Sequence, residues 1–202
     1  RKAKSGQWWV TDPHRALANN SACYTRTPDI GLFMHEWKSL FDSKSGERGI
    51  FNRKSAKDKA AENGRRNVDF DFGTNPCSEI ILRPYQFCNL TEVVVRGADT
   101  PSSLKAKVRL ATILGTFQST LTDFKYLRKI WKDNTEEERL LGVSLTGIMD
   151  NHYTNLPTAD FLKKLRQTAV DVNKELAKKL KIPQSTAITC VKPSGTVSQL
   201  VD

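Results

Sequence analysis

Three side chains of different chemistry stand at alternate positions between residues 75 and 79. Pro76 disfavours the α conformation at Asn75, so we expect the segment to be extended. Alternate side chains of a strand share a face, which would place Asn75, Cys77 and Glu79 in a row about 6–7 Å apart. An amide can hold a hydroxyl group, a carboxylate can accept a proton, and a thiol can supply a hydrogen atom or an electron pair. The row therefore suits a polar, hydroxyl-bearing substrate.

A second thiol, Cys88, lies eleven residues after Cys77 and would return alongside it if the chain folds back at Pro84-Tyr85. Cysteines at this spacing, without paired histidines, make a poor zinc site, and we predict no metal site in the chain. The alternative is that both are core cysteines, since free cysteines are commonly buried. Glu79 would then need a buried partner. The residue types alone favour a chemical role for the two thiols and a core position for them equally.

A second segment that could bind a ligand lies near the end of the sequence. It runs Pro193-Ser194-Gly195-Thr196-Val197 and follows a run with strand character. Gly195 allows the backbone to approach a ligand closely, and N–H groups and hydroxyls at a helix start suit an anion. Serine and glycine also mark ordinary turns, so this signal is weak when taken alone.

Two long helices are expected to position these segments. Apolar residues recur every three or four positions from Leu104 to Leu127, with Ser102 or Ser103 as the cap. A second helix is expected from Thr158 to Lys181, where Pro183 follows and ends it.

Shorter elements alternate with these helices. Short helices are expected at His14–Ala18, Ile30–Phe41 and Lys54–Asn63, and another from Thr135, whose capping box would use Glu138. Strands are expected at Ser78–Leu82, Phe87–Val95 and Thr186–Val191. Long helices among short apolar strands predict an α/β fold.

Composition excludes several classes of protein. The chain has 202 residues, of which 38% are hydrophobic and 27% charged, a balance that argues against a disordered or low-complexity chain. Its four scattered cysteines do not form a secreted disulfide framework, so we expect a cytoplasmic protein. No apolar run approaches the roughly 18–20 residues that a membrane span needs, so we expect no membrane span. The net charge of +10 is compatible with nucleic-acid binding, but its clusters fall on helix-like or loop sequence and are better explained as solvated faces.

The motifs together resemble those of ribonucleotide reductases. Asn75-Pro76-Cys77-Ser78-Glu79 with Cys88-Asn89-Leu90 is similar to the active-site finger loop of the adenosylcobalamin-dependent (class II) enzymes, in their ribonucleoside-triphosphate branch. Three further stretches fit in the same order: Ser45 to Phe51, Gly142 to Gly147, and Lys192 to Ser198. The similarity extends from about Arg15 to the last residue.

The resemblance implies specific roles. Cys77 would carry the thiyl radical that abstracts the 3′ hydrogen, Glu79 would take the 3′-hydroxyl proton, and Asn75 would bind the sugar hydroxyls. Cys88 would be one half of the reducing dithiol. The segment Pro193-Ser194-Gly195-Thr196-Val197 would bind the substrate phosphates.

It also implies a fold, a cofactor and partners. The whole chain, residues 1–202, would be the central part of a ten-stranded α/β barrel of two antiparallel half-sheets, with Cys77 on a loop inside it. Adenosylcobalamin would be the cofactor, a ribonucleoside triphosphate the substrate, and a thioredoxin-like protein the reductant.

Parts of the family pattern are not found in this sequence. They are the upstream reducing cysteine, the C-terminal cysteine pair and a cobalamin-binding segment, and the first residues include no initiator Met. We therefore expect a fragment that is inactive alone. The alternatives are a piece of a class I-type large subunit, a non-functional remnant, or a basic nucleic-acid-binding domain. Cys23 and Cys190 are expected to pack in the core.

Overall fold

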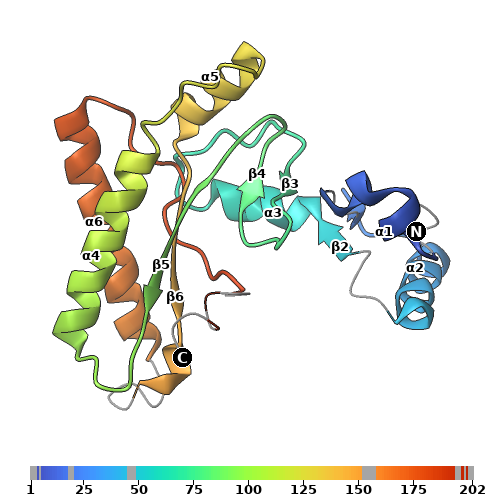
Figure 1. Cartoon of the computed structure of the whole chain (residues 1–202), viewed down its shortest axis with the longest axis horizontal. Helices are drawn as coiled ribbons and strands as arrows, with labels where there is room; N and C mark the ends of the chain where they lie inside the picture. The colour runs from blue at the N-terminus through green and yellow to red at the C-terminus, as the bar shows by residue number, and fades with distance from the viewer. Residues whose placement is uncertain are drawn as a thin grey trace. The chain divides into compact units, whose positions relative to one another are not determined.

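The computed structural model describes residues 4, 6–17, 21–44, 49–151, 158–193, 197 and 199. They belong to two compact units, Arg1–Pro76 and Cys77–Asp202, which are described separately. Figure 1 colours the first from blue to teal and the second from green to red. No helix among the described residues is both long and apolar enough to cross a membrane.

The first unit contains short elements. They are α1 (Trp8–Thr11), η2 (Pro13–Leu17), β1 (Ser21–Tyr24), α2 (Ile30–Ser43), β2 (Gly49–Asn52), α3 (Arg53–Ala61) and β3 (Gly73–Thr74). Strands β1 and β2 pair in parallel. Helix α2 begins at Ile30 as expected. Its N-cap is Asp29, whose carboxylate accepts a hydrogen bond from the Leu32 N–H at 3.1 Å. Arg53 ties α3 to the following segment by donating to the Phe72 carbonyl at 2.8 Å.

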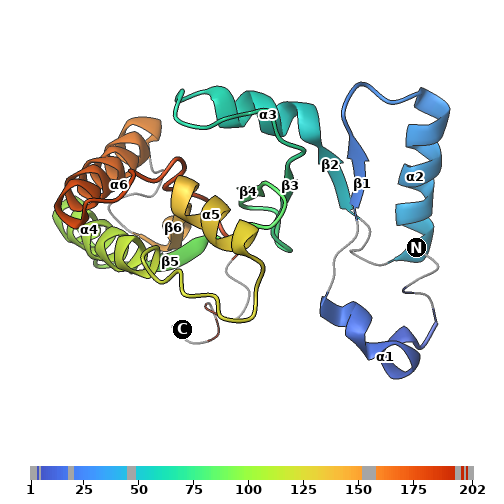
Figure 2. The same ribbon diagram turned by 90° about the horizontal axis from the view of Figure 1, so that it is seen from above.

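The second unit is a two-layer α/β arrangement. It contains β4 (Ile81–Leu82), β5 (Asn89–Val94), α4 (Pro101–Gln118), α5 (Lys129–Glu138), β6 (Leu141–Thr146), η3 (Ile148–Asp150) and α6 (Ala159–Leu180). Strands β5 and β6 pair in parallel, with Asn89 opposite Leu141 and Val94 opposite Thr146. Helices α4 and α6 lie side by side on one face of this pair, as Figures 1 and 2 show from two directions.

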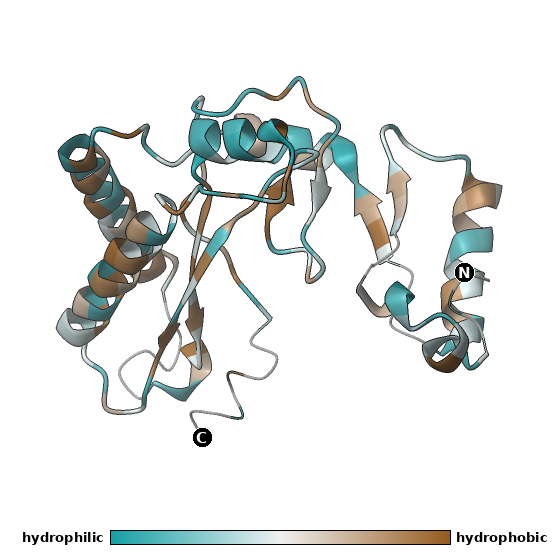
Figure 3. Ribbon diagram, turned by 45° about the horizontal axis from the view of Figure 1, so that its top comes forward, coloured by the Kyte–Doolittle hydropathy of each residue, from teal (hydrophilic) through white to brown (hydrophobic). Residues whose placement is uncertain are grey.

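The core fills the space between these helices and the strands. Val93 and Val95 from β5 and its end, and Leu141 and Val143 from β6, pack against both helices. The helix residues in this cluster are those with the predicted spacing, namely Leu104, Val108, Ala111, Leu165 and Ala169. Figure 3 shows the same pattern, with hydrophobic colour concentrated along β5 and β6 while α3 is largely hydrophilic.

Three sequence-based boundaries are wrong. Helix α4 ends at Gln118 rather than near Leu127. The carbonyl of its C-cap residue Ser119 accepts a hydrogen bond from the Arg139 side chain at 2.6 Å, in place of a bond from a further helical turn. Its N-cap is Thr100, in a capping box with Ser103. The run Thr186–Val191 forms only an isolated bridge, between Thr189 and Val143.

The helix expected to begin at Thr135 begins six residues earlier and ends at Glu138. Helix α5 starts at Lys129, and Thr135 and Glu138 lie in its last turn. Glu138 is buried and accepts a 2.5 Å hydrogen bond from the Gln86 side chain. The Glu138 carboxylate, which the local pattern assigns to a helix N-cap, thus binds Gln86 instead, a residue 52 positions earlier in the sequence.

The fold class is α/β, as the sequence predicts. Within the described residues the sheets are short and no closed barrel is formed. The ten-stranded barrel implied by the resemblance is therefore not seen among these residues.

Candidate functional site

The segment that carries Cys77 is a turn, which corrects the expected strand. Strand β3 ends at Thr74, and Ser78 has a left-handed φ of 67°. A left-handed residue breaks the alternation of a strand, so the predicted common face is not formed. Cys77 is exposed, whereas the Glu79 side chain is only 1% exposed. Asn75, the third member of the predicted row, is half-buried in the first unit.

Cys88 is positioned by a network that anchors the preceding corner to α5. The corner expected at Pro84-Tyr85 is present, and Tyr85 has a φ of 58°. Asn134 donates to the carbonyls of Pro84 and Tyr85 at 3.0 and 3.1 Å. Arg83 donates to Glu137 at 2.7 Å. The chain leaving this corner enters β5, which pairs in parallel with β6.

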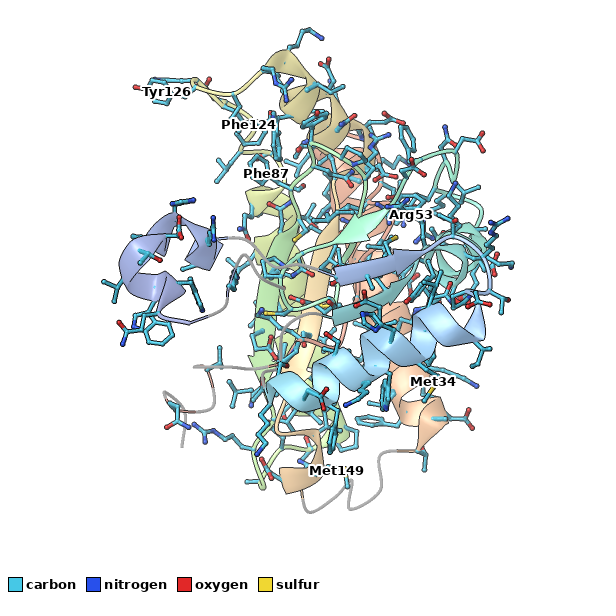
Figure 4. The ribbon with its side chains drawn as sticks, turned by 90° about the vertical axis from the view of Figure 1, so that its right-hand side faces the viewer. Met34, Arg53, Phe87, Phe124, Tyr126 and Met149 are labelled. Carbon is cyan, nitrogen blue, oxygen red and sulfur yellow. The ribbon has the colours of Figure 1, made fainter. Side chains whose placement is uncertain are left out.

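An aromatic cluster strengthens the same corner. The rings of Phe87 and Phe124 lie 5.1 Å apart, and Phe87 also stacks on Trp131 at 4.7 Å. Figure 4 labels Phe87 and Phe124, which lie close together, while Tyr126 extends away from them. Phe87, the residue before Cys88, is therefore packed against two aromatic rings.

The two faces of the β5–β6 pair have different characters. Thr91, Val93 and Val95 on one strand, and Leu141 and Val143 on the other, face α4 and α6. The alternate residues define what we call the site face: Leu90, Glu92, Gly142, Ser144 and Thr146. On this face Thr146 donates to Glu92 at 2.5 Å.

Gly142 makes room on the site face. A Cβ at this position would collide with Leu90 Cδ2, lie 3.0 Å from Ile80 Cδ1, and lie 3.1 Å from Cys190 Sγ. The absence of a side chain at Gly142 therefore lets Ile80 and Cys190 approach the sheet. Because Ile80 directly follows Glu79, the same gap brings the Cys77–Glu79 turn towards the site face.

Glu79 forms an ion pair with Lys192, 113 residues later in the chain. Lys192 Nζ donates to Glu79 Oε1 at 3.2 Å, and the Lys192 side chain is 24% exposed. The Lys192 backbone N–H donates to Ser144 Oγ at 3.0 Å. The hydrogen bond that Lys192 donates to Glu79 raises the pKa of Lys192, although burial opposes it, and the negative charge of Glu79 raises this pKa further. Lys192 is therefore firmly cationic.

Two thiols near this ion pair are held in the protonated form. Burial, followed by the charge of Glu79, raises the pKa of Cys88, while Lys192 partly offsets the effect. Burial raises the pKa of Cys190 to about 12, with further contributions from Glu79 and Glu92. Such thiols are poor nucleophiles at neutral pH, but they retain the hydrogen that a radical or reductive step requires.

The structure brings together some predicted site residues and leaves others undescribed. Cys77, Glu79 and Cys88 are within electrostatic range of the Lys192 and Cys190 segment. Of the predicted phosphate loop, Pro193 is exposed and Val197 half-buried, while Ser194, Gly195 and Thr196 lie outside the described residues. Residues 45–48 of the upstream motif lie outside them as well.

Sequence reasoning missed three residues of this site. Lys192 and Ser144 each stand within a quoted motif but were assigned no role, and Cys190 was expected to be a core residue. Cys190 is instead half-buried beside Gly142, and Cys23, which was also expected in the core, is exposed. The signal that could have identified Lys192 is its position immediately before the predicted anion-binding loop.

A cavity lies on the helix side of β6 and is also lined by Thr189, Cys190 and Val191 of the segment beside this strand. Its volume is about 390 Å³, and its lining is mostly apolar, including Val143, Leu162 and Leu165, with Lys163 and Arg166 among the lining residues. Such a space is too small for a corrinoid with its nucleotide tail. The described residues also contain no cluster of three or more histidine, cysteine, aspartate or glutamate side chains that could hold a metal ion. This cavity is therefore not assigned to a corrinoid cofactor.

Comparison with known proteins finds relatives of one kind. No protein-family model matches the chain. The adenosylcobalamin-dependent ribonucleoside-triphosphate reductase of Lacticaseibacillus paracasei is 29% identical over 219 residues, or 93% of this chain and 28% of that protein. Proteins of the same name from Lactobacillus leichmannii and Lactobacillus helveticus are each 28% identical over 93% of the chain. The chain spans less than a third of the length of these relatives.

A solved structure supports the fold. It is the crystal structure of a B-12 dependent (class II) ribonucleotide reductase, which superposes with a TM-score of 0.63 at 23% identity. The match covers 96% of this chain and 31% of that one. This likeness shows that the chain shares the fold of the matched part of that structure. The resemblance drawn from the motifs is confirmed by these relatives.

Proposed function

We propose that this chain, which resembles the class II ribonucleotide reductases over 93% of its length, is part of the catalytic barrel of such an enzyme. The whole enzyme would reduce ribonucleoside triphosphates to 2′-deoxyribonucleotides for DNA synthesis. One observation carries the proposal: Glu79, from the Cys77 motif, is paired at 3.2 Å with Lys192, at the start of the predicted phosphate loop. The Cys77 motif, which would act on the ribose, is thus in contact with the residue that precedes the predicted phosphate loop.

Cys77 and Glu79 would act on the ribose. A thiyl radical at Cys77 takes a hydrogen atom from C3′, which restores the Cys77 S–H bond and leaves the unpaired electron on carbon. Glu79 takes the 3′-hydroxyl proton, a role that suits a carboxylate paired with a firmly cationic lysine. Asn75 would hydrogen-bond the sugar hydroxyls and the developing carbonyl.

Cys88 would supply part of the reduction. The 2′-hydroxyl gains a proton and leaves as water. Cys88 and a second thiol of the whole enzyme become a disulfide and supply two electrons and two protons, namely the proton that leaves in water and the hydrogen added at C2′. Glu79 returns its proton to the 3′ oxygen. Cys77 returns its hydrogen atom to C3′, which regenerates the radical. The raised pKa of Cys88 favours this role, because the group carries its proton until it is needed.

The phosphates would bind to Pro193, Ser194, Gly195, Thr196 and Val197. Lys192 brings positive charge to the beginning of this segment. A glycine-containing turn with backbone N–H groups suits a triphosphate. A diphosphate substrate is the alternative that the same chemistry would accept.

The remaining parts of the reaction belong to the whole enzyme. Its relatives are named as adenosylcobalamin-dependent, and we propose the same cofactor for the whole enzyme. The cofactor supplies the initial radical when bound. A thioredoxin-like protein would restore the dithiol, and the enzyme would work in the cytoplasm. This segment alone would be inactive.

A complementation assay tests the proposal. The chain is mixed with the remaining N- and C-terminal parts of a class II reductase, adenosylcobalamin, dithiothreitol and a ribonucleoside triphosphate or diphosphate. We expect deoxynucleotide only when every component is present, with the triphosphate as the better substrate. A folded mixture without turnover would contradict the proposal. Salt-dependent DNA binding that survives loss of both Cys77 and Cys88 would favour a nucleic-acid-binding domain instead.

A further inference from the structure

Lys192 connects three motifs that are distant in the sequence. Its ammonium group donates to Glu79 in the Cys77 motif, at 3.2 Å. Its backbone N–H donates to Ser144 in the Gly142–Gly147 motif, at 3.0 Å. It directly precedes Pro193, the first residue of the predicted phosphate loop. A lysine held at both its backbone and its side chain has a fixed orientation.

Glu79 requires such a partner to stay ionised. Its side chain is 1% exposed, and burial disfavours the charged form of a carboxylate. The described titratable groups near it include the Cys77 thiol on its own turn, Cys88 before β5, and Cys190 and Lys192 on the segment beside β6. Glu92 on β5 adds a further negative charge near Cys190. Of these groups Lys192 is the cation, so it favours the ionised carboxylate.

We propose that Lys192 is a positioning residue that holds the Glu79 carboxylate ionised and oriented on the site face. The importance of this role for the reaction rests on the proposed function, in which Glu79 accepts the 3′-hydroxyl proton. Ser144 contributes by fixing the backbone from which Lys192 reaches. This assigns a purpose to the Gly142–Gly147 motif: Gly142 makes the space and Ser144 holds the lysine.

The direct test follows the protonation of Glu79 in the 202-residue chain. Glutamate side chains are labelled with ¹³C, and the Glu79 carboxyl resonance is identified by its loss in Glu79→Gln. The pH titration is then compared among wild type, Lys192→Met, Lys192→Arg and Lys163→Met. Lys163 is an exposed lysine on α6 and serves as the matched control. Circular dichroism checks that each variant is folded, and Lys192→Gln replaces Lys192→Met if the latter does not fold.

The expected result is specific to the charge at position 192. Lys192→Met moves the Glu79 titration midpoint upward by at least about one pH unit, a tenfold change in proton affinity. Lys192→Arg restores the wild-type midpoint, and Lys163→Met leaves it unchanged. A Glu79 midpoint that is the same in folded Lys192→Met or Lys192→Gln as in wild type would overturn the inference.

A second readout connects the ion pair to turnover. In the complemented enzyme, the pH profile of kcat should lose activity on its acid side in Lys192→Met and regain it in Lys192→Arg. A shifted titration in a chain that never forms an active enzyme would defeat the proposed function while leaving the control of Glu79 by Lys192 standing. An unshifted titration in an active enzyme would defeat the inference about Lys192 alone.

Discussion

The side chain of Leu90 occupies the space that a side chain on Gly142 would need. The two residues are opposite one another in the parallel pair β5–β6, and a Cβ on Gly142 would collide with Leu90 Cδ2. The same position is bordered by Ile80 and by the Cys190 thiol. Packing at this glycine therefore determines how closely the Cys77–Glu79 turn and the Cys190–Lys192 segment approach the sheet.

Gly142→Ala should destabilise the second unit by about 1–3 kcal/mol, because the added methyl group overpacks a closely filled site. Chemical denaturation in urea measures the change. Gly115→Ala on α4 is the matched control, since a Cβ there would lie at an ordinary 3.5 Å from Thr91. Alanine also favours a helix over glycine, so this control should be neutral or stabilising. Equal destabilisation by the two variants would contradict the packing argument.

Asn173 should be one of the most sensitive polar positions of the second unit. Its side-chain amide donates to Thr116 Oγ1 at 3.1 Å and to Ser185 Oγ at 3.0 Å, and its oxygen accepts the Ser185 N–H at 3.1 Å. Asn173→Ala leaves these buried partners unsatisfied and should lower the free energy of unfolding by about 2–3 kcal/mol. Lys174→Ala, at the next and exposed position, should change it by less than about 0.5 kcal/mol. Comparable losses in the two variants would show that the network contributes little.

The sequence predicts the elements whose signals are local. Helix α6 was placed correctly because Thr158 caps its start and Pro183 follows its end. The turn at Cys77 was not predicted, because the left-handed conformation of Ser78 has no signature in the residue type. The role of Glu138 was missed because its partner Gln86 lies 52 residues away. The ion pair of Glu79 with Lys192 spans 113 residues, and only the fold brings the two together.

Asp99 should make stability dependent on pH in the acid range. Burial alone would raise the pKa of Asp99, but hydrogen bonds from Lys107, Ser103 and the Arg96 N–H outweigh it and lower the pKa below the usual 3.8. On acidification the unfolded chain therefore binds a proton at this residue before the folded chain does. The stabilisation is present above about pH 3.8 and is lost as pH falls through the lowered value.

Asp99→Asn should accordingly reduce the loss of stability between neutral pH and about pH 3. Urea denaturation at several pH values measures this slope in wild type and variant. Asp160→Asn, which alters an exposed carboxylate on α6, is the control and should keep the wild-type slope. An unchanged slope in Asp99→Asn would contradict the assigned shift.

The four thiols should differ widely in reactivity. Cys23 and Cys77 are exposed, whereas the pKa of Cys190 is raised to about 12 and that of Cys88 is raised as well. Since the thiolate is the reactive form, alkylation at pH 8 should modify Cys190 at least roughly 100-fold more slowly than Cys77. Mass spectrometry of the native chain follows each site, and in urea all four should react alike. Equal native rates for Cys77 and Cys190 would show that Cys190 is not protected.

The central claim is that Cys77 carries the radical, and the most direct measurement compares Cys77→Ser with Cys23→Ser in the complemented enzyme. Both cysteines are exposed and carry free thiols, so the two variants remove the same group from different places. Deoxynucleotide formation should fall below detection in Cys77→Ser and stay near wild type in Cys23→Ser. Turnover that persists in Cys77→Ser, or that is lost equally in both variants, would contradict the assignment of Cys77 as the radical thiol.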